Sequence, residues 1–265
     1  MSDLVLCSHQ AAVSTLTLNR PSALNSFTAE LHHELLARLE EAAKNPEVRC
    51  IVLAGAGRAF CAGQDLADPM VAPGPEGSAP KDLGPVIEHL YKPLVQRLRS
   101  MPVPVVAAVH GVAAGAGANL ALCCDVVVAA KSASFIQAFA KIGLIPDTGG
   151  TWLLPRLVGR AQAFGLALLG DKLSAADAER IGLIWKCVDD AAFADEVASL
   201  AQRLAAMPVA ALVATRRALD RAQHLTLDEA LMEEARVQSG LGQAHDYLEG
   251  VAAFSAKRPP VFTDR

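Results

Sequence analysis

Two glycine-rich turns and one aspartate supply the residues of this sequence that could do chemistry. The turns are Cys61-Ala62-Gly63-Gln64-Asp65 and Gly115-Ala116-Gly117, about fifty residues apart. Each follows an apolar, strand-like run and opens a helix, so each aims main-chain N–H groups at open space. Two such donors that converge on one oxygen form an oxyanion hole, which stabilises the enolate of a thioester. The aspartate, Asp147, then supplies one acid or base.

Each of these features also has a purely structural explanation. Gly63, Gly115 and Gly117 permit tight turns and close packing of a helix on a strand. Asp147 can cap the helix that follows it, because the helix dipole favours a carboxylate at that end. Four apolar neighbours would instead desolvate Asp147, raise its pKa and make it a base near neutral pH: Phe139, Leu144, Ile145 and Trp152. The pair of turns together with one acid favours a catalytic site.

Composition limits the class of protein. The chain has 265 residues, of which 52% are hydrophobic, so it can bury a large core in one main domain with an appendage. The net charge of −4 argues against nucleic acid as a partner, because phosphate binding needs a basic face. The longest apolar run, 103–109, is too short to cross a bilayer, so no membrane partner is expected.

The cysteines and the N-terminus bear on the compartment. The six cysteines form no CxxC pair, and nothing in the chain has metal-ligand spacing, so we expect reduced thiols and no bound metal. Cys61 has no histidine near it in the sequence and is expected to be a small packing residue. No signal peptide is recognised, because Asp3 and His9 interrupt any apolar stretch. A cytoplasmic protein is expected.

Strands that alternate with helices predict an α/β layered architecture. Strands are expected over 13–19, 50–54, 103–109 and 125–130. Thr28 is expected to cap a helix that runs to Lys44. From Ser174 onward the pattern is almost wholly helical, with helices expected over 191–207, 209–223, 227–240 and 245–256.

Two segments have no clear packing partner in the sequence. Residues 68–84 are rich in proline and glycine and predict a loop, which is either a lid over the site or an exposed insertion without a role. The predicted helix 227–240 and the residue before it carry apolar side chains that favour either an oligomer interface or packing within the chain: Leu225, Leu227, Leu231, Met232 and Val237.

Taken together, these segments resemble the crotonase superfamily, also called the enoyl-CoA hydratase/isomerase family. The likeness runs from Leu16-Thr17-Leu18-Asn19-Arg20-Pro21, through both glycine turns and 143–150, to Lys257-Arg258-Pro259. It implies a spiral of ββα units over 1–195 that carries the site for a CoA thioester. It also implies a C-terminal helical trimerisation region over 196–265, in a homotrimer or hexamer.

The resemblance assigns roles to residues of both turns. The family's oxyanion donors correspond to the N–H groups of Gln64 and Ala116, while Asp65 marks the turn. The same comparison places the bound acyl group against Ala62, Asp65, Gly115, Gly117, Asn119 and Phe139. Asn119 would bind the substrate or an ordered water, or would fix the start of a helix.

Two departures from the family pattern distinguish isomerase from hydratase activity. Family hydratases carry two catalytic glutamates, and the corresponding positions here hold Asn119 and Phe139, neither of which is an acid or base. Isomerases and dehalogenases of the family place an acid near position 147, where this chain has Asp147. The resemblance therefore implies an acyl-CoA isomerase, with Asp147 moving one proton between carbons and no hydratase activity.

Within the family, the segments are most similar to members that act on ring 1,2-epoxyphenylacetyl-CoA and form an oxepin. A 3-enoyl-CoA would give the 2-enoyl-CoA by the same proton shift. The alternatives are a general 3,2-enoyl-CoA isomerase of fatty-acid oxidation and a CoA-thioester-binding subunit without turnover. Phe254 and Lys257 resemble family positions that reach the adenine and phosphates of CoA, often from a neighbouring subunit. No cofactor is implied beyond the CoA of the substrate.

Overall fold

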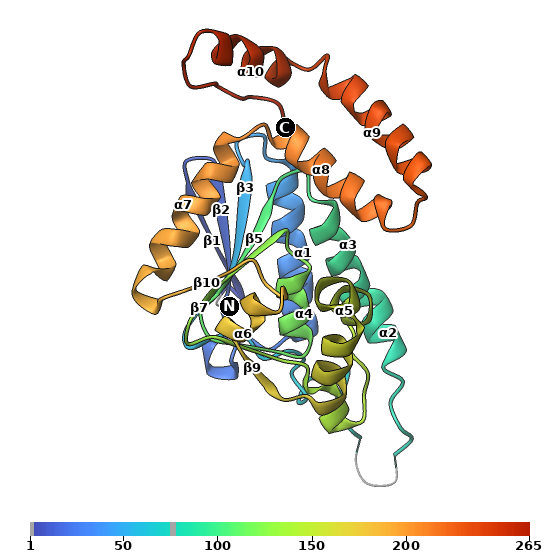
Figure 1. Cartoon of the computed structure of the whole chain (residues 1–265). Coiled ribbons are helices and arrows are strands. Elements are labelled where there is room, and N and C mark those ends of the chain that lie inside the picture. The colour runs from blue at the N-terminus through green and yellow to red at the C-terminus, as the bar shows by residue number, and fades with distance from the viewer. Residues whose placement is uncertain (1–2, 75–77) are drawn as a thin grey trace.

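The computed structural model describes residues 3–74 and 78–265 of the chain. Within these residues the chain forms two β-sheets surrounded by helices (Figure 1). The larger sheet has the order β1-β2-β3-β5-β7-β10, and all its pairs are parallel except β1 with β2. Its strands are β1 (Val5–Gln10), β2 (Val13–Leu18), β3 (Cys50–Gly55), β5 (Val105–Val109), β7 (Val126–Ala130) and β10 (Lys186–Val188).

Three of the four strands of the smaller sheet directly follow strands of the larger one. Its order is β4-β6-β8-β9, and its strands are β4 (Ala59–Cys61), β6 (Val112–Ala114), β8 (Ser134–Ile136) and β9 (Lys172–Ser174). The pairs β3–β4, β5–β6 and β7–β8 each give one strand to the larger sheet and the next to the smaller sheet, and a helical segment follows each pair. This repetition is the spiral of ββα units that the resemblance implies.

The helices lie between and after these strands. In the first half of the chain they are η1 (Pro21–Ala23), α1 (Ala29–Lys44), α2 (Gly84–Val86), the π-helical η2 (Ile87–Tyr91), α3 (Lys92–Ser100) and α4 (Ala116–Leu122). The second half contains η3 (Ala138–Ile142), α5 (Gly150–Leu169), α6 (Ala175–Arg180), η4 (Asp190–Ala192), α7 (Phe193–Ala206), α8 (Val209–Ala222), α9 (Leu227–Leu241) and α10 (His245–Ser255).

The strands β3, β5 and β7 are buried on both faces, as their near-continuous runs of apolar residues require. One face of the sheet packs on α1 and α3, and the other face packs on α7. The cap of α1 forms as predicted, because the Thr28 side chain accepts a hydrogen bond from the Leu31 N–H. The strands expected over 13–19, 50–54, 103–109 and 125–130 are confirmed within two residues at each end.

The division of the chain differs from the expected boundary at 195/196. That boundary falls inside α7, whose residues Val197, Ala201 and Ala205 are buried against strand residues of the larger sheet. The core extends beyond residue 195 because α7 covers one face of the larger sheet. Figure 1 shows that α9 and α10 are the part that stands away from the sheets.

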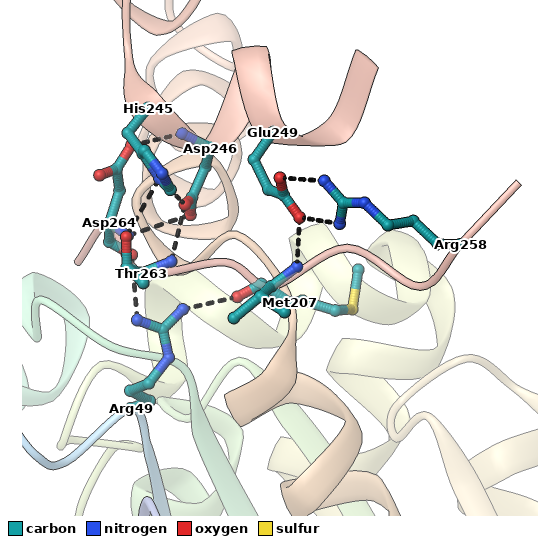
Figure 2. Close-up of polar contacts among 9 residues, drawn as sticks. Arg49, Met207, His245, Asp246, Glu249, Arg258, Thr263 and Asp264 are labelled. Carbon is teal, nitrogen blue, oxygen red and sulfur yellow. Dashed lines mark hydrogen bonds and ion pairs between the residues drawn. The ribbon is translucent and has the colours of Figure 1, made fainter. Parts of the chain in front are cut away.

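The chain end returns along α10 and fastens it (Figure 2). Glu249 accepts hydrogen bonds from the Arg258 guanidinium and from the Val261 N–H. Asp246 accepts the N–H groups of Thr263 and Asp264 at 2.7 and 3.1 Å. The placement of α10 therefore depends on the last residues of the chain.

α9 has no buried residue, and Leu227, Leu231 and Met232 on it are all exposed. The face is packed only in part within the chain: α9 contacts α8, and Leu225 and Val237 are half-buried, while the other three side chains stay exposed. Across residues 3–74 and 78–265, no single helix has the length and apolar character needed to cross a membrane. One pair, Asp190–Ala206 with Val209–Ala222, meets that test when taken together, although it is bent by 100°.

Candidate active site

Three segments that are distant in the sequence line one cavity of about 300 Å³. Gln64 comes from the turn after β4, Ala116 from the first residue of α4, and Asp147 from the segment between η3 and α5. Ala62, Gly115 and Phe139, which sequence reasoning also assigned to the acyl site, line the same cavity. The structure thus brings together both proposed oxyanion donors and the proposed acid.

The Gln64 N–H is directed by two hydrogen bonds that flank it. The Phe27 N–H donates to the Gly63 oxygen at 2.7 Å, and the Asp65 N–H donates to the Phe27 oxygen at 2.9 Å. In this parallel bridge the residue between the two bonds turns its own N–H away from the partner chain. Among the described residues, the Gln64 N–H meets no hydrogen-bond acceptor.

The second donor lies at the start of α4. Gly115 has φ 52° and ψ −126°, a conformation that glycine adopts without strain, and its own N–H donates to the Ile136 oxygen. Ala116 is the first helical residue, so its N–H has no partner in the helix and none among the described residues.

The two turns approach each other closely. Gly63 has φ 92°, and a Cβ atom at this position would lie 2.8 Å from the Ala114 oxygen and 3.3 Å from the Ala116 nitrogen. The absence of a side chain at Gly63 therefore lets the turn that carries Gln64 lie against the turn that carries Ala116. Two unsatisfied main-chain donors in one apolar cavity have the composition of an oxyanion hole.

Asp147 is a mostly buried carboxylate whose one hydrogen bond in the described structure is from the Thr148 hydroxyl, at 2.8 Å. Burial raises its pKa above the ordinary value, as expected. The alternative in which its side chain caps α5 does not hold, because the N-cap residue is Gly149 and no side-chain capping bond is present. The Gly150 N–H instead bonds to the main-chain oxygen of Asp147 at 2.7 Å.

Apolar side chains form the remaining walls of the cavity. Phe139, Leu144 and Ile145 lie beside Asp147 as expected, and the other large apolar residues are Leu66, Val71, Leu83, Val86, Ile87 and Ile142. The loop expected over 68–84 is present in its described residues, and both of its flanks reach this cavity; residues 75–77 lie outside the described part. These walls keep water from the carboxylate and so maintain its raised pKa.

Trp152 does not belong to these walls, so the expectation that it desolvates Asp147 is wrong. Its ring lies in a separate cavity between α5 and α8, with the Arg156 guanidinium 4.2 Å from the ring centre. Trp152 is in the first turn of α5, and the direction of that helix carries its side chain away from the acid. An arginine stacked on the ring stabilises it there.

Asn119 is fully buried and does not line the cavity. Its side-chain amide donates to the main-chain oxygen of Asp147 at 2.8 Å, and its side-chain oxygen accepts from Gln137 at 2.8 Å. Both ends of the amide are therefore occupied by protein groups. Asn119 thus contacts the backbone of Asp147 in this structure, and contact with the substrate or an ordered water stays a prediction.

Asp65 and Gly117 also stand behind the cavity instead of lining it. Asp65 pairs with Arg20 at 2.9 Å, and a hydrogen bond from Arg20 lowers the pKa of its carboxyl, so it stays ionised and marks the turn as expected. A Cβ at Gly117 would lie 2.3 Å from the Cys61 oxygen, so glycine is needed there for α4 to pack on β4. Cys61 is buried, and burial raises its pKa to about 12, which fits a packing residue.

Phe254 and Lys257 are not brought to this cavity. They lie at the end of α10 and just after it, while Figure 1 places α10 at the opposite end of the molecule from α2, which borders the cavity. Phe254 is 88% exposed and lines a groove beside α10 together with Tyr247 and Phe262. In a single chain these two residues therefore have no access to a thioester in the cavity.

One group of side chains outside the cavity has the elements of a metal site. Ligand atoms of His245, Asp246 and Asp264 lie within 4.8 Å of one another. Figure 2 shows that the Asp246 carboxylate already accepts main-chain N–H groups of the chain end, and the Asp264 carboxylate accepts the Asp246 N–H at 2.9 Å. The cluster is explained by the docking of the tail on α10.

Sequence reasoning missed Tyr91. This residue is 2% exposed, lines the cavity, and donates its hydroxyl to the side-chain oxygen of Gln64 at 2.8 Å. Desolvation raises the pKa of the hydroxyl well above its ordinary value, so it stays protonated. Its position at the end of a π-helical turn is typical of functional sites, but no motif in the sequence signals that turn.

With this fold and this cavity, the chain belongs to the enoyl-CoA hydratase/isomerase family, whose model matches residues 8–265. It is 52% identical over 265 residues to 1,2-epoxyphenylacetyl-CoA isomerase of Escherichia coli K12, with both chains covered completely. It is 49% identical over 253 residues to a protein of Rhodobacter capsulatus named as a probable enoyl-CoA hydratase, covering 96% of this chain and 95% of the relative.

The fold is shared with solved members of the same family. The crystal structure of an enoyl-CoA hydratase from Mycobacterium smegmatis aligns with a TM-score of 0.87 and 32% identity, covering 98% of this chain and 99% of that one. The mixed α/β fold therefore agrees with the one that the resemblance implies. Relatives named as isomerase and as hydratase both match over nearly the whole chain, so overall similarity does not decide between the two reactions.

Proposed function

We propose that this protein is an acyl-CoA isomerase in which Asp147 carries a proton between two carbons of the acyl group. The proposal rests on one observation. Gln64 and Ala116, which carry the two N–H groups that are unpaired in the described part of the chain, line the same cavity as the Asp147 carboxylate. Among the described residues that line this cavity, Asp147 is the one carboxylate. One acid/base suffices for an isomerisation, because the reaction takes up and releases no net proton.

The reaction follows from the position of these groups. The thioester oxygen accepts hydrogen bonds from the Gln64 and Ala116 N–H groups, and the Asp147 carboxylate removes a proton from C2. Electrons move onto the oxygen as an enolate, and the protonated carboxyl returns the proton to the far carbon of the conjugated system. Losing one such main-chain donor costs about 3–4 kcal/mol in the barrier, so the pair decides whether the enolate forms.

For the substrate, we infer ring 1,2-epoxyphenylacetyl-CoA, converted to oxepin-CoA, and 3-enoyl-CoA, converted to 2-enoyl-CoA. The named isomerase of Escherichia coli supports the ring substrate through its 52% identity. The apolar walls and the volume of about 300 Å³ suit a six- or seven-membered ring or a short enoyl chain. No cofactor is needed beyond the CoA of the substrate itself.

Hydration of an enoyl-CoA is disfavoured in this proposal. The positions that correspond to the two hydratase glutamates hold Asn119, whose amide is engaged on both ends, and Phe139, which has no ionisable group. Water added to a double bond needs a base to activate it and an acid to protonate the neighbouring carbon. The cavity offers Asp147 alone for both roles.

For the nucleotide end of CoA, we infer contact with Phe254 and Lys257 from a neighbouring subunit of a homotrimer or hexamer. The exposed aromatic ring of Phe254 can stack on adenine, and the lysine cation suits phosphate. Their distance from the chain's own cavity in Figure 1 requires another copy of the chain to bring them to a bound thioester.

Three thioesters test the proposal together. Purified protein is incubated separately with 3-hexenoyl-CoA, crotonyl-CoA and the phenylacetyl-CoA ring epoxide, and the products are separated by chromatography and identified by mass. The proposal predicts isomerised products from the first and third and no 3-hydroxybutyryl-CoA from crotonyl-CoA. Hydration of crotonyl-CoA at a comparable rate would contradict it, and no change in any thioester would favour a binding subunit.

A further inference from the structure

Tyr91 is held rigidly at the back of the cavity. Its ring meets His32 edge-on with ring centres 4.2 Å apart and meets Phe27 at 5.9 Å. The ring is thus packed between buried aromatic groups, and a buried tyrosine needs a partner for its hydroxyl. That partner is the side-chain oxygen of Gln64.

The Gln64 side chain is held at both ends of its amide. Its nitrogen donates to the Phe27 oxygen at 3.0 Å, and its oxygen accepts the Tyr91 hydroxyl at 2.8 Å. The same residue supplies the N–H that faces the cavity. The Tyr91 hydroxyl is therefore connected, through the Gln64 side chain, to the Gln64 N–H, which is the proposed donor to the thioester oxygen.

We propose that Tyr91 is a positioning residue for the oxyanion hole, acting through the Gln64 side chain to keep the Gln64 N–H free and aimed into the cavity. This inference rests on the proposed function, because it assigns a role within the same site. Without the hydroxyl, the oxygen of the Gln64 amide is left buried without its donor. The Gln64 side chain then loses the contact that fixes its oxygen, and the turn that carries the Gln64 N–H loses one of its side-chain anchors.

Two features make a merely structural role for Tyr91 insufficient. The hydroxyl donates to the Gln64 side-chain oxygen, although buried hydroxyls bond most often to main-chain groups. Tyr91 also shares the cavity wall with Asp147, whose charge contributes to raising the pKa of the tyrosine. The proton of the hydroxyl is therefore committed to Gln64, the residue that carries the first proposed donor.

The kinetic test uses Tyr91→Phe and the control Ser100→Ala, which removes an exposed hydroxyl at the end of α3, outside the cavity. We expect Tyr91→Phe to lower kcat on 3-hexenoyl-CoA by about 10- to 100-fold while KM changes by less than about threefold, because the lost alignment matters in the transition state. The control should keep wild-type kcat. An unchanged kcat in Tyr91→Phe overturns the proposal.

A double-mutant cycle separates positioning from direct action on the substrate. Gln64→Met keeps the N–H at residue 64 and the length of the side chain but removes the acceptor for the hydroxyl. If Tyr91 acts through Gln64, then Tyr91→Phe lowers kcat in the wild type and has little further effect in Gln64→Met. Equal losses in both backgrounds would show that the hydroxyl acts on substrate directly and would overturn the proposal.

A spectroscopic readout keeps the test independent of turnover. Cinnamoyl-CoA has a conjugated carbonyl whose absorption moves to longer wavelength when hydrogen bonds polarise it. We expect the bound probe to be red-shifted in wild type and less shifted in Tyr91→Phe at saturating protein. A full red shift in the variant contradicts the positioning role. A red shift in wild type without turnover of any thioester would instead reject the proposed function and leave the hole intact.

Discussion

The side-chain amide of Asn119 donates a 2.8 Å hydrogen bond to the main-chain oxygen of Asp147. Asn119 lies on α4, one turn after Ala116, so the helix that begins with a proposed oxyanion donor also holds the backbone of Asp147. The proposed acid and the proposed hole are therefore connected through one helix. A shift of α4 would displace both groups together, and loss of the amide would separate them.

Replacing Asn119 by leucine, which has a similar size, tests this connection. The change leaves the buried Gln137 amide without its acceptor and leaves the Asp147 oxygen with the Gly150 N–H as its remaining donor, which costs about 1–3 kcal/mol in the free energy of unfolding. We expect a lower Tm and a kcat on 3-hexenoyl-CoA that falls by about tenfold or more, with binding of the thioester retained. A variant with wild-type kcat would show that Asp147 is held without this bond.

The raised pKa of Asp147 has consequences for stability and for pH dependence. Because the folded pKa lies above the unfolded value, the folded state holds the proton more tightly. This contribution to stability is present at low pH and is lost as pH rises through the folded pKa. We expect Asp147→Asn to raise Tm at neutral pH, since it removes a buried charge. A Tm of Asp147→Asn below that of the wild type at pH 7 would contradict the idea that burial of the Asp147 carboxylate destabilises the fold.

Activity should follow the ionisation of the same group. The base form is the carboxylate, so kcat/KM should rise with pH through an apparent pKa above 3.8, the ordinary value for aspartate. A pH–rate profile of 3-hexenoyl-CoA isomerisation between pH 4 and 8 measures this directly. A kcat/KM that stays constant from pH 8 down to pH 4 would mean that a carboxylate with a raised pKa is not the group that titrates.

His32 predicts a second pH effect, on stability alone. It is buried, neither ring nitrogen has a hydrogen-bond partner among the described residues, and desolvation lowers its pKa from 6.5 to about 3. The depressed folded pKa means that stability is fully present above pH 6.5 and falls by about 1.4 kcal/mol per pH unit as pH drops toward 3. We expect the free energy of unfolding of His32→Leu, measured by urea titration, to fall less steeply with decreasing pH than that of the wild type. His9→Gln, at an exposed position of β1 that does not contribute to the His32 shift, is the control that should keep the wild-type slope.

Gly117 and Gly165 form a matched pair for the packing of α4. A Cβ at Gly117 would lie 2.3 Å from the Cys61 oxygen, whereas a Cβ at Gly165 would have no atom within 4 Å. Gly117→Ala should therefore push α4 away from β4, displace the Ala116 N–H, and lower both Tm and kcat. Gly165→Ala should raise the free energy of unfolding by about 0.5–1 kcal/mol and leave kcat unchanged. If Gly117→Ala and Gly165→Ala changed Tm and kcat in the same way, the close approach of α4 to β4 at Gly117 would be contradicted.

Much of the spiral core was predictable because its signals are local. The strands β3, β5 and β7 follow from short apolar runs, and the two turns follow from glycines, since Gly63 and Gly115 both adopt positive φ. The roles of the Gln64 and Ala116 N–H groups came from the resemblance, and a main-chain donor keeps its role whatever its side chain. The proposed donor roles could therefore be transferred from the family to Gln64 and Ala116 without regard to their side chains.

What could not be predicted depends on where side chains point. Asn119 donates to the Asp147 backbone and Trp152 lines a different cavity, and neither contact has a signal in the residues next to it in the sequence. Tyr91 meets Gln64 across 27 residues of sequence through a π-helical turn that no residue pattern announces. The exposed residues of α9 and the exposed ring of Phe254 have no local signal in the sequence, and their contact with another copy of the chain stays a proposal.

The most direct test of the central claim is the turnover of 3-hexenoyl-CoA by Asp147→Asn, measured beside the red shift of bound cinnamoyl-CoA in the same variant. With the main-chain donors in place and the proton carrier removed, the red shift should remain while kcat falls by at least about a thousandfold. A variant that keeps near-wild-type kcat would contradict the assignment of Asp147 as the residue that moves the proton.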